Sequence, residues 1–140
     1  MPFRALFPAL FATLASPALA QDDATGTLSL ELNSVAAQEG DCRMSFVVLN
    51  GQAVDLTSVV LEAVLFDADG AVDRLTLFDF GALPTGRTRV RQFVVPDLAC
   101  ERLGKVLING AQTCDAADGT AGLCMDGLTL STRIGVEVIG

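Results

Sequence analysis

The feature that most constrains this chain is a series of short apolar runs, rich in β-branched and aromatic residues, that recur about every ten residues. Gly, Asp, Asn or Pro bounds each run, and these residues favour turns. Runs this short are typical of strands rather than helices. The pattern therefore predicts an all-β protein, an antiparallel immunoglobulin-like β-sandwich of about seven strands. The predicted strands cover residues 27–32, 43–49, 59–66, 72–80, 87–95, 105–108 and 128–139.

Four cysteines provide a second constraint on the fold. Cys42, Cys100, Cys114 and Cys124 form an even set, which in an exported protein predicts two disulfides. Three pairings are possible, and we favour Cys42–Cys100 with Cys114–Cys124. The first pair precedes two strands that run in the same direction, so both cysteines are expected at one end of the sandwich. The second pair closes part of a long polar loop predicted over residues 111–127. The CxxC spacing of zinc sites is absent, so no metal is expected.

The beginning of the chain is typical of a secretory signal. Arg4 precedes an uncharged apolar run over residues 5–15, which is shorter than the ~20 residues of a membrane-spanning helix. Ala18 and Ala20 form a small-x-small cleavage pattern. We therefore expect a cleaved signal peptide over residues 1–20 and a single β-sandwich domain over 21–140. A single arginine before the apolar run favours the general secretory route. The expected location is the periplasm or the exterior, with no membrane span.

Composition argues against most enzymatic chemistry and against nucleic-acid binding. The chain has 9 Lys and Arg against 17 Asp and Glu, a net charge of −8, which repels nucleic acid. It contains no histidine, so Ser-His-Asp and Cys-His sites cannot be built. We expect neither catalysis nor a cofactor. A glycosidase-like pair of carboxylates is compatible with the composition, although nothing in the sequence selects one.

An alternating set of arginines is the least ordinary local feature. Arg87, Arg89 and Arg91 should project from one face of the fifth predicted strand. Such a face could bind a carboxylate ligand or an acidic partner strand. The alternative is a solvent face whose arginines pair with acids on neighbouring strands, such as Glu62 or Asp79. We favour this alternative.

A turn with three acidic residues is a second candidate binding site. Asp67, Asp69 and Asp73 surround Gly70, and calcium prefers such oxygen ligands. The segment lacks the full spacing of an EF-hand loop, so we favour a solvated hairpin turn. The same interpretation applies to the acidic residues of 115–119.

Two further segments leave alternatives open. Leu123 and Met125 flank Cys124 and form either an exposed contact site or a cover over the end of the sandwich. A short helix is possible over residues 97–103.

Four stretches of the chain carry a resemblance to a known family. They resemble small exported Gram-negative bacterial proteins labelled "Tat pathway signal sequence domain protein". That label implies a twin-arginine leader, whereas this chain has one arginine before its apolar run. The resemblance implies no catalytic or binding residues. The stretches are LEAVLFDADGAVDRLTLFDFGALPTG (61–86), RVRQFVVPDLAC (89–100), VLINGAQTC (106–114) and GLTLSTRIGVEVIG (127–140).

A looser similarity supports the predicted strands. Residues 45–50 and 65–70 are similar to immunoglobulin-like bacterial domains of the FxLYD type. The lack of a recognisable catalytic constellation and the scaffold joined by disulfides lead us to expect a non-enzymatic binding or accessory module whose partner is another envelope protein. The alternative is a small-ligand or calcium-binding module that uses the arginine face or the acidic turn described above.

Overall fold

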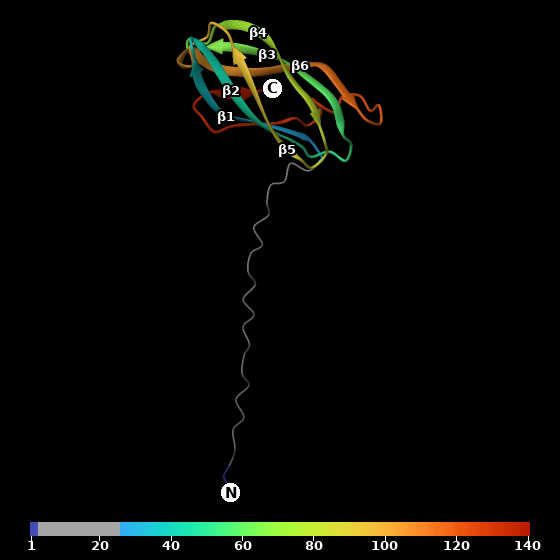
Figure 1. Cartoon of the computed structure of the whole chain (residues 1–140). Coiled ribbons are helices and arrows are strands. Elements are labelled where there is room, and N and C mark those ends of the chain that lie inside the picture. The colour runs from blue at the N-terminus through green and yellow to red at the C-terminus, as the bar shows by residue number, and fades with distance from the viewer. Residues whose placement is uncertain (3–25) are drawn as a thin grey trace.

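A computed structural model describes residues 1–2 and 26–140 (Figure 1). Most of the predicted signal peptide, including its cleavage point, lies outside the described residues. The described chain folds into two four-stranded sheets: sheet A has the order β5-β2-β1-β7, and sheet B has the order β4-β3-β6-β8. The predicted β-sandwich is thus confirmed. The elements are β1 (Leu28–Gln38), β2 (Asp41–Asn50), β3 (Leu56–Asp67), β4 (Val72–Leu83), β5 (Thr88–Val95), a 3-10 turn η1 (Cys100–Arg102), β6 (Leu103–Ala116), β7 (Thr129–Thr132) and β8 (Glu137–Ile139).

The C-terminal third differs in detail from the expected arrangement. Strand β6 continues to Ala116, because it stays paired with β3 through several register shifts, so the predicted loop over 111–127 begins later. The last predicted strand divides into β7 and β8, which lie in different sheets. Both pair in parallel, β7 with β1 and β8 with β6, so the sandwich is not wholly antiparallel. The helix considered over 97–103 is reduced to the single turn η1.

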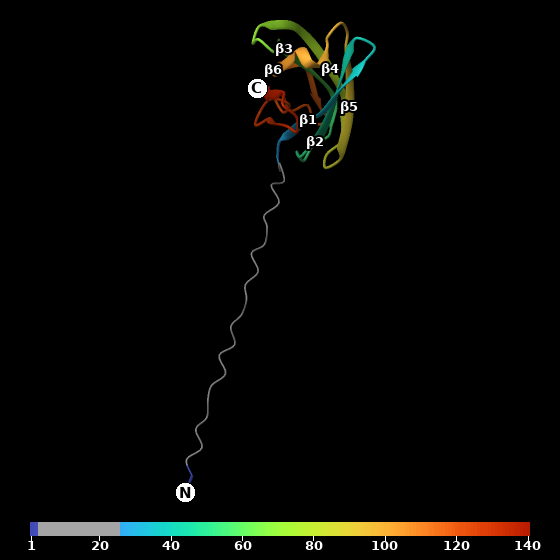
Figure 2. The same ribbon diagram turned by 90° about the vertical axis from the view of Figure 1, so that its left-hand side faces the viewer.

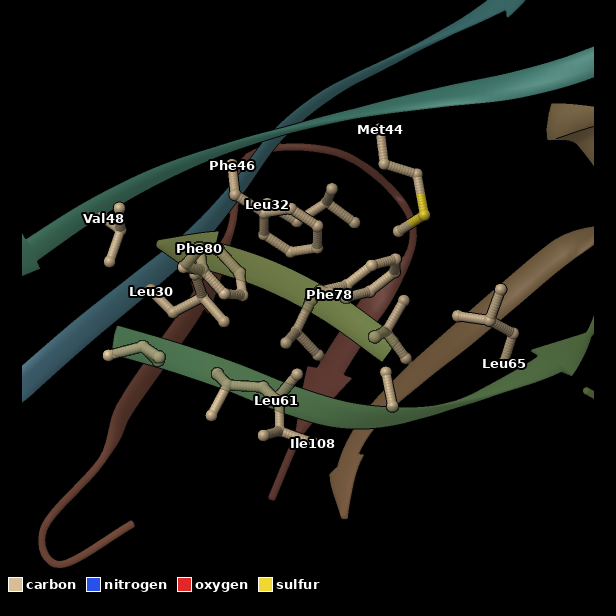
Figure 3. Close-up of a cluster of buried hydrophobic side chains, with 14 of the residues drawn as sticks. Leu30, Leu32, Met44, Phe46, Val48, Leu61, Leu65, Phe78, Phe80 and Ile108 are labelled. Atoms are coloured by element: carbon tan, nitrogen blue, oxygen red, sulfur yellow. The ribbon is translucent and has the colours of Figure 1, made fainter. Parts of the chain in front are cut away.

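Strict alternation of side chains builds the core between the sheets. Along β2, buried and half-buried residues alternate over the whole strand, as expected for a strand with one face on the core. Figure 3 shows side chains from both sheets pointing into the shared interior. Phenylalanines dominate its centre: the rings of Phe78 and Phe93 stack at 4.5 Å, and Phe46 lies 5.5 Å from Phe78. This cluster joins β2 and β5 of sheet A to β4 of sheet B.

Both predicted disulfides are present. Cys42, at the start of β2, bonds to Cys100 in η1, and Cys114 on β6 bonds to Cys124 in the following loop. Two disulfides indicate an oxidising environment outside the cytoplasm. Leu123 and Met125 pack against the core, which decides between the two alternatives for this pair: they cover the end of the sandwich.

Candidate functional site

The outer face of sheet B, the side turned away from the core, is unusually apolar. On β3, Leu61, Ala63 and Leu65 belong to the core, so the alternate residues Val64 and Phe66 project outward. Val64 lies outside the core cluster and yet is only 8% exposed. Neighbouring side chains on the same outer face must therefore cover it.

The strand register identifies the neighbours that cover Val64. On one side Val64 pairs with Leu75 of β4, and on the other it pairs with Leu107 of β6. Leu107 pairs in turn with Ile139 of β8. Each of the four strands thus contributes one aliphatic residue to a continuous line across the sheet. We call Leu75, Val64, Leu107 and Ile139 the aliphatic row.

Strand β4 extends this apolar surface along the edge of the sheet. Leu75 is 61% exposed, Leu77 49% and Val72 57%. Val72 pairs with Phe66, so its side chain continues the same face beyond the row. Contiguous apolar surface with a polar border often marks an interaction site.

The outer face of sheet A provides an internal comparison. There Val90 of β5 pairs with Val47 of β2, and Val47 pairs with the charged Glu31 of β1. In the next line of paired residues across the sheet, Leu49 of β2 lies between Ser29 of β1 and Thr88 of β5. Polar residues therefore interrupt each line, and no aliphatic row crosses sheet A.

A shallow hollow lies beside the aliphatic row. It has a volume of about 270 Å³ and is lined by Glu62, Leu75, Thr76, Leu77 and Gln112. Glu62 is half-buried and pairs with Leu77 across the strands. The hollow thus combines aliphatic walls with a carboxylate.

Charged residues flank the opposite side of the row. Lys105 of β6 lies 3.6 Å from the carboxylate of Glu137 on β8 and 5.9 Å from the centre of the Phe66 ring. An apolar centre with a polar border is the usual composition of a protein–protein interface.

The predicted arginine face takes a different form. Arg87 is exposed just before β5, whereas Arg89 and Arg91 are half-buried on the side of β5 that turns toward the core. Arg91 donates hydrogen bonds from Nε to the carbonyl oxygen of Phe80, at 2.8 Å, and from Nη2 to that of Ala82, at 3.3 Å. The structure therefore does not bring the three arginines together on one open surface.

The expected partners of these arginines lie elsewhere. Glu62 accepts a hydrogen bond from Nδ2 of Asn109 at 2.6 Å, on the outer face of sheet B. Asp79 accepts from the main-chain amide of Gly81 at 2.9 Å. Arg91 bonds to main-chain carbonyls of β4 because β4 is an edge strand of sheet B. Carbonyls on the open side of an edge strand have no strand partner.

The acidic turn is held by its own local interactions. Oδ1 of Asp67 accepts the main-chain amide of Asp69 at 2.9 Å, as in an Asx turn. Arg102 lies 3.6 Å from Asp67 and 3.8 Å from Asp69, while Asp73 forms an ion pair with Arg74. Among the described residues, no group of three His, Cys, Asp or Glu side chains is placed to hold a metal ion. The three aspartates therefore do not converge.

Comparison with protein-family models, with curated proteins and with solved structures finds no significant match for this chain. Within residues 1–2 and 26–140, no helix is long and apolar enough to cross a membrane.

Proposed function

We propose that this protein is a non-enzymatic binding or accessory module that works in the periplasm or outside the cell, and that it attaches to another envelope protein through the outer face of sheet B. The observation that carries the proposal is the aliphatic row, one residue from each of the four strands, with Leu75 and Leu77 exposed at its edge. The predicted signal peptide and the two disulfides support the location.

The energetics of burial favour a partner over permanent exposure. Burying a fully exposed leucine is worth about 1.5–3 kcal/mol. Leu75 and Leu77 still expose about half of their surface, so covering both supplies a useful part of a binding free energy. Side chains carried on hydrogen-bonded strands also need little ordering of their backbone on binding. The surrounding charged residues, such as Lys105 and Glu137, border the apolar centre and would limit non-specific association.

The alternative of a ligand site at the arginine face has less support. Arg91 already uses its guanidinium to hold β4, and Arg89 is half-buried beside it. A carboxylate ligand would have to compete with these main-chain bonds. The acidic turn is similarly occupied by Arg102 and by its own amides.

Site-specific photocrosslinking tests the proposal. A photoreactive residue is introduced at Leu75, and in a matched variant at Val90, which is 58% exposed on the outer face of sheet A. In cells that naturally export the protein, we expect a discrete adduct from position 75 that disappears when Leu77→Asp is added. Thermal unfolding of each variant checks that the fold is retained. Absence of an adduct from position 75, or equal adducts from both positions, would overturn the proposal.

A further inference from the structure

The hollow beside the aliphatic row has a composition that selects for one kind of ligand group. Leu75 and Leu77 of β4 form one wall, and Gln112 of β6 forms another. Gln112 reaches this position because the pairing of β3 with β6 shifts between Val60 and Leu61, which leaves Gln112 out of register. Glu62 provides the single ionisable group in the lining.

The carboxylate of Glu62 retains capacity for a further hydrogen bond. Its Oε1 accepts the amide of Asn109, which orients the carboxylate without neutralising it. In the described part of the chain, none of the ion pairs includes Glu62. A carboxylate has about four lone-pair positions, so a cation can bind beside Asn109.

A lysine or arginine side chain matches this combination of groups. Both have a long aliphatic stem that packs on apolar surface and a cationic head that forms charge-assisted hydrogen bonds with carboxylates. The stem would lie against Leu75 and Leu77, and the head would reach Glu62. The chain has 17 acidic and 9 basic residues, so a second, equally acidic copy would be repelled and a cationic protein attracted.

We propose that the hollow receives a lysine or arginine side chain from the partner, and that an aliphatic residue two positions away in the same partner segment contacts the aliphatic row. This inference rests on the proposed function and names the chemistry of its partner. The spacing follows from β3, where Glu62 and Val64 are two residues apart, about 6.6 Å in a strand. Because β3 lies between β4 and β6, the partner segment would lie over the outer face of the sheet, parallel to β3. An extended segment has the same repeat, so the expected pattern is cation-x-aliphatic.

A peptide titration followed by NMR tests this inference on the exported protein. The probe is the capped peptide Thr-Val-Thr-Lys-Thr-Val-Thr, and the reference is the same peptide with norleucine in place of lysine. We expect the lysine peptide to bind about tenfold or more tightly, and to shift the amide signals of Glu62, Leu75, Leu77 and Leu107. Equal affinity for the two peptides, no binding, or shifts confined to sheet A would overturn the inference.

A matched pair of variants isolates the carboxylate. Glu62→Gln keeps the acceptor for Asn109 and removes the charge, so the affinity for the lysine peptide should fall to that of the norleucine peptide. Glu31 is the control: it lies on sheet A and accepts a hydrogen bond from Asn33 at 3.1 Å, so Glu31→Gln should leave the affinity unchanged. Equal losses in the two variants would indicate a general effect of net charge and would contradict the inference.

Two other occupants are separate outcomes of the same experiment. If pentylamine binds as tightly as the lysine peptide, the hollow is a site for small cations and the partner inference is wrong. If dilution of the protein alone changes the signals of Leu75 and Leu107, the occupant is a second copy, and the inference is also wrong.

A crosslink from position 75 combined with no preference for lysine would refute this inference alone. A lysine preference without a crosslink would refute the proposed function.

Discussion

Arg91 on β5 donates a hydrogen bond from Nε to the carbonyl oxygen of Phe80 on β4, 2.8 Å away. These strands are edges of different sheets, and they lie side by side at one edge of the sandwich (Figure 2). A second bond from Nη2 reaches Ala82. One guanidinium therefore joins the two sheets and covers carbonyls that an edge strand would leave open to another chain.

Replacing Arg91 should destabilise the sandwich. Arg91→Met keeps much of the aliphatic stem and removes both bonds to β4, so the free energy of unfolding should fall by about 1.5–3 kcal/mol. Arg91→Lys should restore only part of this loss, because an ammonium cannot imitate the planar fork. Arg87→Met, at an exposed position, should change stability by less than about 0.5 kcal/mol. Urea unfolding measures all three, and equal effects at the two arginines would contradict this role.

Gly104 should not tolerate a methyl group. A Cβ at this position would clash with the carbonyl oxygen of Asp67, at the end of β3, and would lie 3.1 Å from Cα of Ala68 in the following turn. Gly104→Ala must displace this backbone, at a cost of about 1–3 kcal/mol. Gly110→Ala on the same strand is the control, because a Cβ there meets nothing within 4 Å. Thermal unfolding should show a lower Tm for the first variant alone.

The two disulfides should contribute unequally to stability. The Cys42–Cys100 bond spans 58 positions of sequence and the Cys114–Cys124 bond spans 10. Loop-closure entropy predicts a loss of about 4 kcal/mol when the first is replaced by two alanines and about 3 kcal/mol for the second. Cys42 and Cys124 are both fully buried, so each double variant also loses packing, and the expected difference between the two rests on loop length. Denaturant unfolding of the two double variants would reveal the difference, and the reverse order would be inconsistent with this reasoning.

Hydrogen bonds from the side-chain hydroxyl of Thr120, which has the larger effect, and from its main-chain amide hold the pKa of Asp118 below its ordinary value. The main-chain amide of Thr120 lies 2.9 Å from Oδ1. Because the folded-state pKa is lowered, this interaction stabilises the fold above the unfolded pKa of the carboxyl group, and the effect is lost as pH falls through the folded value. In an NMR titration, Thr120→Val should raise the pKa of Asp118 part of the way back, since the amide remains. An unchanged pKa would exclude the side-chain contribution.

Strand positions were predictable because they depend on local patterns, and the pairing of Cys42 with Cys100 followed from the expected direction of the strands after them. The runs at 43–49 and 59–66 alternate or are continuously apolar, and turn residues separate them from their neighbours. The parallel pairing of β7 with β1 and of β8 with β6 was not predictable. The direction of pairing depends on where a distant part of the chain enters the sheet. The bend between these short strands lets one segment complete both sheets.

The orientation of β5 shows how a site can be misjudged from alternation alone. Arg89 and Arg91 share their side of the strand with Phe93, and the ring of Phe93 stacks on Phe78 in the core. Val90 and Val94 consequently face solvent. The position of the phenylalanine relative to the arginines was the available signal, because an aromatic ring is the stronger indicator of the core-facing side.

Asn50 also has a larger role than its sequence position indicated. As part of an Asn-Gly pair it predicts the end of a strand, and β2 does end there. The structure adds that its side chain is fully buried, with Nδ2 bonded to the carbonyls of Val54, at 2.9 Å, and Leu83, at 2.8 Å. Leu83 is distant in sequence, so this link between β2 and the end of β4 could not be read from local pattern.

The disulfide connectivity has a consequence for biogenesis. The cysteines are joined in the order in which they occur, the first to the second and the third to the fourth. A polypeptide that crosses a membrane from its N-terminus delivers Cys42 and Cys100 before the later pair, so oxidation of thiols as they arrive yields the native bonds directly. Such a chain requires an oxidant on the far side, and its order of arrival favours the native bonds over mismatched ones.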